Sequence, residues 1–521
     1  MTTLTAPPRR WLSPWTFIGL IFLLRLLYLP LFCSITDLAG DESYYWEWGR
    51  RPDWGYYSKP PMIGWLMGLA GFVTGHAEWG IRLAALVLGT LTLGCLALLA
   101  DRMFGRRAAV LTVLLAALTP ANAALNLFFT IDAPLMLCWS AALLAVWTCI
   151  EQPSRWQSWL FLGLALGFGN LSKQMMLVFP ALLLVLLAVE PTLRPLLRRP
   201  GLWLAIVGSL AFLIPVVRWQ MQHQWITLEH TREHFHAADL TVGKWFVQFL
   251  SFPVAQALLY TPVTWGLMIL ATVGGLWKWR SREMRQRFLV IFSGPALLVF
   301  CLLALRQSIN PNWPAVFHLS ALVLVAGSVA GLLGAGAGAG EAVVKNIRAW
   351  ISERTMRLAL RTGAVICALA YVLPLAASLP QKMGWDVPDP MRRLRGWDEA
   401  GAQAGRLLAR APRPERTFFL AMGHRENASQ FAFYTPQHPR VYRWQPDGRI
   451  ASQYELWPDA SGRTGDDALI LQPSEKPLPN SLIKAFSTLK PMGVIEVPLG
   501  SGENRYWQVF LGRELKRWPE R

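Results

Sequence analysis

The sequence predicts an all-α polytopic membrane domain followed by a small C-terminal α/β soluble domain. Three observations support this fold class. Only 16% of the 521 residues are charged and 53% are hydrophobic, whereas about a quarter of the residues in a soluble globular protein are charged. Apolar stretches follow one another up to about residue 380, and many are long enough to cross ~30 Å of hydrocarbon. From about Trp385 the composition becomes ordinary, so we place the two domains at 1–383 and 384–521.

The membrane domain is predicted to contain eleven transmembrane helices. The first apolar run lacks a small-residue cleavage site and is therefore predicted to be a true span rather than a signal peptide. The predicted spans lie near 12–32, 79–100, 108–127, 131–150, 157–172, 173–189, 202–219, 258–278, 287–305, 313–335 and 358–378.

The basic residues indicate the orientation of these spans. The formal net charge is +18, which in a soluble protein would suggest a nucleic-acid partner. Here Lys and Arg gather in alternate loops, and such loops stay in the cytoplasm. We therefore predict a cytoplasmic N-terminus, a periplasmic C-terminal domain and no nucleic-acid partner. The basic loops carry Arg102, Arg106, Arg107, Arg155, Arg194, Arg198, Arg199, Lys278, Arg280, Arg282, Arg285, Arg287, Lys345, Arg348, Arg354 and Arg357.

Two long loops, 33–78 and 220–257, are predicted to lie on the outer side. The first is crowded with Tyr and Trp, whose amphipathic rings favour the headgroup zone of a bilayer. Parts of this loop are therefore expected to lie flat on the membrane surface as interfacial helices. Such a loop could hold a lipid-linked substrate beside the reacting groups.

The tail is predicted to fold on its own as a small α/β domain. Residues 391–410 have the periodicity of an amphipathic helix, and short apolar runs separated by Gly, Pro and Asp indicate strands. A Gly-Ala run at 334–340 is predicted to be a flexible cytoplasmic connector. The predicted strands are 417–422, 468–471, 494–499 and 507–511.

The strongest candidate site lies in the first outer loop, where the acids Asp41 and Glu42 precede an aromatic segment that ends at Tyr57 and Lys59. Glycosyl transfer needs a carboxylate for the proton of the acceptor and a cation for the departing phosphate. We assign Asp41 to catalysis and the other three residues to substrate binding. Two alternatives remain open at this point, because Asp41 could cap a helix beginning at Glu42 and Lys59 could be a snorkelling lysine.

A second candidate acid, Asp132, stands at the outer start of the fourth span, and Lys173 occupies a very short outer turn. Ionisable groups at a membrane face are costly unless they serve a cavity, so we count Asp132 as catalytic and Lys173 as phosphate-binding. The alternatives are a helix cap for Asp132 and a helix anchor for Lys173.

The second outer loop contributes His230 and Arg232, which we expect to face an anionic headgroup or phosphate. His234 and His236 lie close by, so a metal site is conceivable, although a solvated polar loop is the commoner outcome. The segment 310–315 opens the tenth span with Asn and Trp residues that suit sugar binding.

In their order, these motifs resemble the bacterial branch of the glycosyltransferase family that includes the protein O-mannosyltransferases. The same clan holds the lipid A aminoarabinose transferase and the galacturonosyltransferases of the lipopolysaccharide core. The resemblance covers most of the chain, including segments 428–434 and 453–457 of the tail. The motifs are Asp41-Glu42, Lys59-Pro60-Pro61, Asp132-Ala133-Pro134 and Leu171-Ser172-Lys173.

The resemblance implies a GT-C fold, a polyprenyl-phosphate sugar donor and an inverting transfer assisted by a divalent metal ion. It makes Asp41 the acid at the catalytic centre, Asp132 the second acid, and Lys59 the lysine that contacts the carrier phosphate. The aminoarabinose enzyme has a zinc-binding glutamate just before that lysine, where this chain has Ser58. Because a serine hydroxyl is a poor zinc ligand, the remaining ligand candidates are Asp41, Glu42 and the histidine cluster.

The sequence therefore predicts a glycosyltransferase of the bacterial inner membrane that moves a sugar from a polyprenyl-phosphate carrier to lipid A, lipopolysaccharide or another envelope acceptor. A protein acceptor with the same donor is the near alternative. A lipid flippase or transporter, or a lipid-binding scaffold, represents a different class. A transporter more often shows broken helices or acids deep within its spans, whereas the acids of this chain gather at one face.

Overall fold

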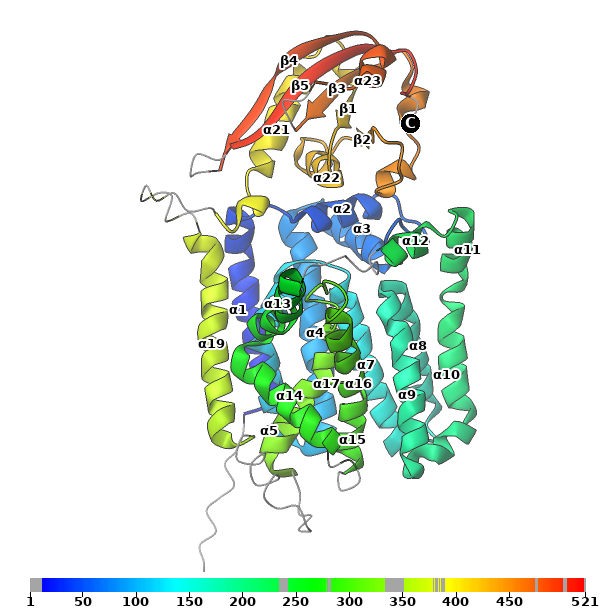
Figure 1. Ribbon diagram of the computed structural model, residues 1–521, viewed down its shortest axis with the longest axis vertical. Coiled ribbons are helices and arrows are strands. Elements are labelled where there is room, and N and C mark those ends of the chain that lie inside the picture. Colours follow the sequence, from blue (N-terminus) through cyan, green and yellow to red (C-terminus); the bar gives the residue numbers. More distant parts are fainter. Residues whose placement is uncertain are drawn as a thin grey trace, which may run out of the picture. The chain divides into compact units, whose positions relative to one another are not determined.

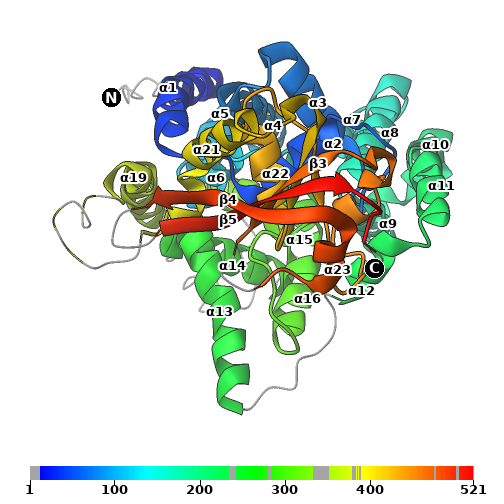
Figure 2. The same ribbon diagram turned by 90° about the horizontal axis from the view of Figure 1, so that it is seen from above.

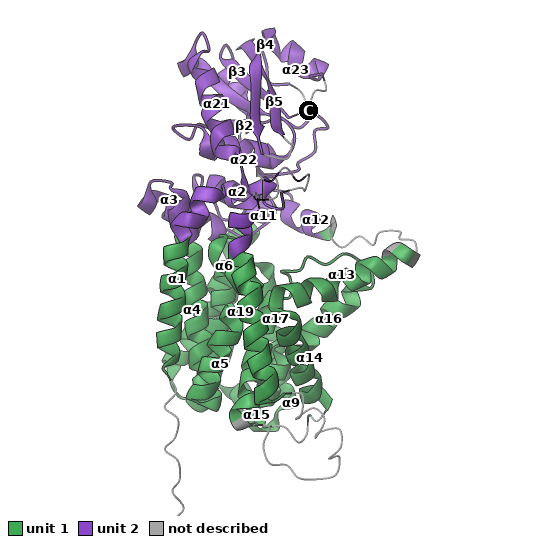
Figure 3. Ribbon diagram, turned by 90° about the vertical axis from the view of Figure 1, so that its left-hand side faces the viewer, with its two compact units in different colours: residues 1–28, 83–218, 232–371 green, residues 29–82, 219–231, 372–521 purple. Residues whose placement is uncertain are grey.

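The computed structural model describes residues 12–233, 242–277, 279, 283–332, 351–377, 379, 383, 385, 389–473, 477–499 and 504–519. The chain forms two compact units, each built from segments that are distant in sequence (Figure 3). The first unit comprises residues 1–28, 83–218 and 232–371, and the second comprises 29–82, 219–231 and 372–521. The predicted boundary between 383 and 384 stays a prediction.

The first unit consists of helices (Figure 1), and each of the eleven predicted spans coincides with one helix or with two consecutive helical segments. Short helical pieces often replace one long helix because Pro and Gly interrupt the runs. The helices are α1 (Pro14–Ile35), α4 (Glu78–Phe104), α5 (Arg106–Ala117), α6 (Pro120–Leu127), α7 (Asp132–Glu151), α8 (Trp156–Ser172), α9 (Val178–Val189), α10 (Pro200–Ala211), α11 (Ile214–Gln222), α13 (Val242–Tyr260), α14 (Pro262–Trp277), α15 (Met284–Ile291), α16 (Gly294–Ala304), α17 (Ala315–Gly327) and α19 (Glu353–Ala376).

Among the described residues, six helices are long and apolar enough to cross a membrane. The number rises to eight if each bent pair counts as one span, with bends of 72° between α5 and α6 and 109° within the α13–α14 pair. The second bend falls at Thr261, whose φ of 63° is in the left-handed region. The protein is thus a multi-pass membrane protein, and the count of eleven spans stays a prediction.

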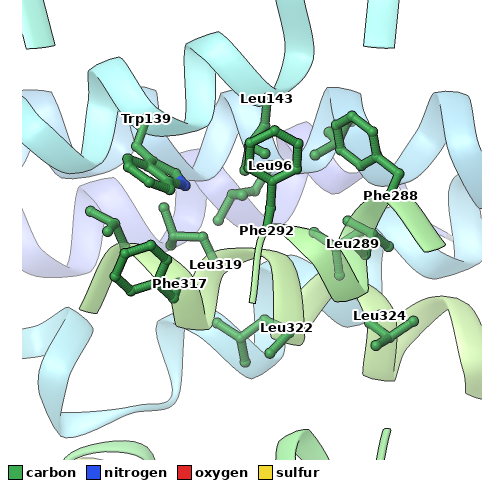
Figure 4. Packing of buried hydrophobic residues seen from close by; sticks show 14 of the residues in the cluster. Leu96, Trp139, Leu143, Phe288, Leu289, Phe292, Phe317, Leu319, Leu322 and Leu324 are labelled. Atoms are coloured by element: carbon green, nitrogen blue, oxygen red, sulfur yellow. The ribbon is translucent and has the colours of Figure 1, made fainter. Parts of the chain in front are cut away.

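The core of the first unit surrounds α17, all of whose residues are buried. A helix that is apolar on every side belongs at the centre of a bundle. Figure 4 shows Trp139 of α7 beside Phe317 of α17, with the ring centroids 5.1 Å apart in an edge-on arrangement. Phe179 of α9 meets the same Trp139 ring edge-on at 4.9 Å. This packing fixes the starts of α7 and α17, where polar residues gather.

The predicted cytoplasmic loops meet one another at one end of this bundle. Arg287 forms an ion pair with Glu190 at 2.6 Å, Arg107 pairs with Glu353, and Arg285 donates to the carbonyl oxygen of Met103. The C-terminal part of α7 lies at this end, since Arg102 donates to the Thr148 hydroxyl, whereas Asp132 stands at the start of α7. The basic loops and Asp132 are therefore at opposite ends of one helix.

The second unit contains the first outer loop, which folds into α2 (Gly40–Gly49) and α3 (Met62–Thr74). The two helices touch through their backbones, because a Cβ added at Gly49 would lie 2.4 Å from the amide nitrogen of Gly68. Helix α3 exposes apolar side chains, among them Phe72 at 85%. The interfacial position predicted for this loop stays a prediction.

The tail, also in the second unit, is a five-stranded sheet with helices, as expected for a small α/β domain. The strand order is β2-β1-β3-β5-β4. Strands β1 to β3 run parallel, and β4 and β5 form a long antiparallel pair (Figure 2). The elements are α21 (Trp397–Ala409), β1 (Thr417–Ala421), α22 (Arg425–Tyr434), β2 (Val441–Arg443), β3 (Asp467–Gln472), α23 (Asn480–Ala485), β4 (Phe486–Pro498) and β5 (Asn504–Leu515).

Several boundaries differ from the sequence predictions. The helix predicted over 391–410 begins only at Trp397, because Gly396 takes a φ of 80° and interrupts the chain there. Strands β4 and β5 are longer than predicted, and β2 and α22 were missed. The loop 220–257 contains α12 (Ile226–Glu233) and most of α13. The Gly-Ala run at 334–340 lies outside the described residues.

Candidate functional site

Asp41 lies in the first turn of α2 but does not cap it. The N-cap residue is Ala39, which has extended backbone angles. The Asp41 side chain is 54% exposed and lies 3.2 Å from the guanidinium of Arg425. The capping alternative therefore does not explain this carboxylate, which is open to a ligand.

Glu42 behaves differently from its neighbour. Its side chain is fully buried, its Oε2 accepts the backbone N–H of Ala39 at 2.9 Å, and the same oxygen lies 3.6 Å from the Arg82 guanidinium. These contacts give Glu42 a structural role at the start of α2. Its assignment to substrate binding stays a prediction.

The aromatic segment after α2 is held by hydrogen bonds to distant parts of the second unit. The backbone N–H of Tyr57 donates to Oε1 of Gln453 at 2.6 Å, and the N–H of Gln453 donates to the Tyr44 hydroxyl at 2.6 Å. Tyr56 and Lys59 exchange backbone hydrogen bonds across a tight turn, which sets the half-buried Lys59 side chain. Gln453 thus ties the tail to both aromatic stretches.

His230 joins this group through Tyr57, since the two rings are 4.7 Å apart. The helix that carries His230 is attached to the same segment, because the Thr227 hydroxyl donates to the carbonyl oxygen of Tyr56 at 3.0 Å. Arg232 stands exposed near the end of α12. His234 and His236 lie outside the described residues.

In the first unit, Asp132 and Lys173 form a buried ion pair. The Lys173 ammonium donates to Asp132 Oδ1 at 2.8 Å, and the two residues are only 3% and 8% exposed. Asp132 is not the cap of α7, a position that Ile131 occupies. The structure therefore brings together two of the predicted site residues, one from the start of α7 and one from the turn after α8.

A third member of this cluster, Asn312, lies in the segment 310–315 that the sequence suggested for sugar binding. Its side-chain amide donates to Asp132 Oδ2 at 2.6 Å, so both carboxylate oxygens are engaged. The segment before α17 is itself fixed, because Gln256 donates to the carbonyl oxygen of Pro311 at 2.9 Å. The Asn-Pro-Asn-Trp-Pro segment was the available signal, but nothing in it pointed to Asp132.

Asp37, just before α2, is a buried acid that accepts a backbone hydrogen bond from the tail. Its Oδ2 accepts the backbone N–H of Trp397 at 2.7 Å, and the residue is 9% exposed. Burial raises the pKa of Asp37 to about 6, against the opposing effect of that hydrogen bond. The link between this acid and α21 is therefore sensitive to pH.

The site residues fall into two groups in different units. Asp41, Glu42, Tyr57, Lys59 and His230 belong to the second unit, and Asp132, Lys173 and Arg232 belong to the first. That Asp41, Lys59 and Asp132 line one cavity stays a prediction.

The divalent metal ion implied by the resemblance stays a prediction, because the candidate ligands His234 and His236 lie outside the described residues. Within 12–233 and the later described ranges, no group of three or more His, Cys, Asp or Glu is arranged to hold a metal ion. Glu42, one ligand candidate, is already engaged by Ala39 and lies near Arg82. We derive no step through a metal.

A cavity of about 570 Å³ lies in the first unit between α8 and α10. It is lined mainly by apolar and small residues such as Trp156, Gly163 and Ala205, and Pro153 and Arg199 stand at the end of the basic loops. Its lining contains no carboxylate. This cavity is therefore distinct from both groups of acids.

Comparisons with known proteins agree with the fold. Residues 58–219 match the family model described as dolichyl-phosphate-mannose-protein mannosyltransferase. The lipid A galacturonosyltransferase RgtD of Rhizobium johnstonii is 27% identical over 426 residues, which are 81% of this chain and 82% of that protein.

Among solved structures, ArnT from Cupriavidus metallidurans in the apo state has a TM-score of 0.60 and 19% identity, covering 95% of this chain and 98% of that one. The same enzyme bound to undecaprenyl phosphate gives a TM-score of 0.61 at 18% identity, with the same coverage. The helical architecture, the family model and these relatives together identify the chain as a multi-pass membrane glycosyltransferase with the GT-C fold.

Proposed function

We propose that this protein transfers a sugar from a polyprenyl-phosphate carrier to a lipid A-type glycolipid. The observation that carries the proposal is the likeness to a lipid A galacturonosyltransferase along four-fifths of both chains. A solved structure with the same fold holds undecaprenyl phosphate, which supports a carrier of this chemistry. Neither comparison identifies the sugar.

The donor phosphate is assigned to the cations of the outer loops. Lys59 sits on a tight turn beside Tyr57, and the Tyr57 ring contacts His230. A lysine ammonium and a histidine next to an aromatic ring suit a phosphate diester whose lipid tail remains in the bilayer. Arg232 and Lys173 are further candidates for the phosphate, although Lys173 is engaged with Asp132 before substrate binds.

The proposed reaction is a single displacement. A hydroxyl of the acceptor attacks the anomeric carbon, the bond from that carbon to the phosphate oxygen breaks, and polyprenyl phosphate leaves with its electron pair. Asp41, which is exposed on α2, takes or orients the hydroxyl proton. Lys59 stabilises the charge that grows on the leaving phosphate. Attack from the opposite face inverts the anomeric configuration.

Asp132 is assigned to the sugar side of this reaction. Its two oxygens already accept from Lys173 and Asn312, so it is less available than Asp41 to receive a proton. A fixed carboxylate can hold sugar hydroxyls in position, which lowers the entropic part of the barrier. We therefore give Asp132 an orienting role.

We further propose that the protein resides in the bacterial inner membrane with its N-terminus in the cytoplasm and its C-terminal domain in the periplasm. The basic loops lie together at one end of the bundle, and short loops rich in Lys and Arg stay in the cytoplasm. Single cysteines at Arg155 and Arg449, in a background without native cysteines, test this orientation. A membrane-impermeant thiol reagent applied to intact spheroplasts should label only position 449. Labelling of position 155 alone would show that the protein has the opposite orientation.

A protein acceptor is a second candidate, because the family model that matches 58–219 is described as a protein mannosyltransferase. The two candidates share the donor and differ in the acceptor. Purified protein should therefore be offered a panel of undecaprenyl-phosphate-linked sugars, with galacturonic acid first, together with either lipid A or a periplasmic protein extract.

Mass spectrometry of the products decides between them. A mass increase of one sugar on lipid A supports the proposed function, and an increase confined to protein replaces it with the second candidate. Movement of the carrier lipid across vesicles without any sugar transfer would instead identify a flippase. An Asp41→Ala protein that folds and transfers sugar at the wild-type rate would refute the proposed role of Asp41.

A further inference from the structure

The tail of the chain reaches Asp41 through one firmly packed helix. On the face where α22 meets the loop around α2, the Ser43 and Ser429 hydroxyls are 2.9 Å apart. Gln430 donates to the carbonyl oxygen of Leu38 at 2.7 Å, and Leu38 donates to the Tyr434 hydroxyl at 2.6 Å. All these groups lie within the second unit. The position of α22 on α2 is therefore fixed by buried hydrogen bonds.

This packing places the first turns of the two helices against each other. A Cβ added at Gly40 would lie 2.8 Å from the Glu426 carboxyl group, so Gly40 allows the close approach. The Arg425 guanidinium consequently lies 3.2 Å from Asp41 Oδ1 and 4.8 Å from the centroid of the Tyr44 ring.

The ion pair between Arg425 and Asp41 is open to solvent and is not what holds the helices together. The two side chains are 29% and 54% exposed, and such pairs add only about 0 to 1 kcal/mol to stability. Docking is already provided by Ser429, Gln430 and Tyr434. Arg425 therefore has capacity to bind a ligand beside Asp41.

Two further arginines of the tail influence the pKa of Glu426, the residue next to Arg425. Burial raises the pKa of Glu426, and the positive charges of Arg505 and Arg393 oppose that increase. Arg505 is held by the carbonyl oxygens of Arg395 at 2.8 Å and Arg393 at 3.1 Å, and so it also fixes the turn that presents the exposed Arg393.

Charges of both signs act on Glu426. The charges of Arg505, Arg393 and Arg425 lower its pKa and the charge of Asp41 raises it, while Asp37 is a further acid that acts on Arg505. His424 lies in the same field, because burial lowers its pKa first and the charges of Arg425 and Arg443 lower it further. We leave Arg443 out of the cluster because it pairs with Glu455.

We propose that Arg393 and Arg425, supported by Arg505, form a binding site for a phosphate monoester of the lipid acceptor next to Asp41. Guanidinium groups bind phosphate oxygens with paired, charge-assisted hydrogen bonds. The site would hold the acceptor by its phosphate while a hydroxyl of the same molecule reaches Asp41. This inference rests on the proposed function, and it adds the tail as the part that recognises the acceptor.

The carrier lipid also bears a phosphate, so the chemistry alone allows two sources. We assign the site to the acceptor because its cations come from the tail, whereas Lys59 is the cation assigned to the carrier. The experiment therefore offers three probes separately to the full-length protein in detergent, namely bisphosphorylated lipid A, the same lipid A after enzymatic dephosphorylation, and undecaprenyl phosphate. Binding is measured by native mass spectrometry.

We expect the wild-type protein to bind bisphosphorylated lipid A at least tenfold more tightly than the dephosphorylated form. Arg425→Ala should remove most of this preference, since one charge-assisted hydrogen bond corresponds to roughly a tenfold change in affinity. Arg425→Lys should retain part of the preference. Neither variant should change the binding of undecaprenyl phosphate by more than about twofold. Arg449→Ala is the matched control, because its side chain is 84% exposed and pairs with nearby Asp447.

Ser429→Ala controls for the docking of α22, since it weakens the contact with Ser43 without touching a cation. It should lower thermal stability and preserve the preference for phosphorylated lipid A. An unchanged preference in Arg425→Ala overturns the site, as does a loss confined to undecaprenyl phosphate. If the wild-type protein binds neither form of lipid A, the proposed acceptor fails instead, so the two failures are distinguishable.

Discussion

The two acids that lead the candidate site are held in opposite ways. Asp132, in the first unit, is almost fully buried and has both oxygens engaged by Lys173 and Asn312. Asp41, in the second unit, is half exposed and has one loose contact with Arg425. A buried, paired carboxylate is part of the fold, while an exposed one is free to change partners during a reaction. The two acids should therefore respond differently to mutation.

The largest effect on stability is expected from Lys173→Ala. It leaves the buried Asp132 carboxylate without its cation, and loss of one partner from a buried ion pair typically costs about 3–5 kcal/mol. Thermal unfolding of the purified protein in detergent measures the change. The double variant Asp132→Leu/Lys173→Met should recover much of that stability while staying inactive. A Lys173→Ala protein as stable as wild type would show that the ion pair between Lys173 and Asp132 does not stabilise the fold.

A pH effect is expected at Asp37. Burial raises its folded pKa to about 6, so the folded state binds more protons than the unfolded state between the ordinary pKa and pH 6. Stability should therefore fall as pH rises through that window and remain at the lower level above it. Asp37→Asn cannot ionise and should be more stable than wild type at pH 7.5, by up to about 3 kcal/mol.

The measurement is the unfolding temperature of both proteins at pH 4.5, 6 and 7.5. The two curves should converge at the acid end, where the wild-type carboxyl is protonated. If the difference between them stays constant with pH, the ionisation of Asp37 does not contribute to it.

A smaller loss is expected for Asn312→Ala, which removes the second contact of Asp132 at its Oδ2. A hydrogen bond to a charged group contributes about 1.5–3 kcal/mol. If Asn312 positions Asp132, the variant should also lower kcat more than it raises the KM for donor. Asn312→Asp is a second test, because its carboxylate would repel Asp132. This variant should be less stable than Asn312→Ala and should have a lower kcat.

The smallest change in stability is expected for Asp41→Ala, at below about 1 kcal/mol, since its ion pair is exposed. Its transfer activity should nevertheless fall by about a hundredfold or more, as for loss of a general base. A loss of activity without a loss of stability is the sharpest test of the difference between Asp41 and Asp132. An Asp41→Ala protein that unfolds easily would show that Asp41, like Asp132, is structural.

Much of the membrane fold could be predicted from the sequence because apolar runs carry their own signal. Each predicted span coincides with helical segments, and the predicted position of β1 differs from the observed one by a single residue. Strand β2 has only three residues, and α22 contains polar and aromatic residues without a clear period. Strand β2 forms because it pairs with β1, and α22 packs on α2. Neither contact can be predicted from the local sequence.

The site was partly predictable for the same reason. Asp132 and Lys173 were both placed on the outer side because the alternation of spans puts the start of α7 and the end of α8 on the same side. The contacts of Asn312 and Arg425 with their acids were missed, since they span 180 and 384 positions of the chain. Pairings over such distances depend on the tertiary fold, and neither residue lies in a motif that names its partner.

The backbone contact between Gly49 and Gly68 has a consequence for how substrates reach Asp41. Helices α2 and α3 are pressed together without intervening side chains, and α22 is bonded to the same assembly. The helix carrying Asp41 cannot swing out alone, so it cannot serve as a hinged gate. Admission of a lipid would instead depend on rotation of side chains such as Arg425, which takes picoseconds to nanoseconds when they are exposed.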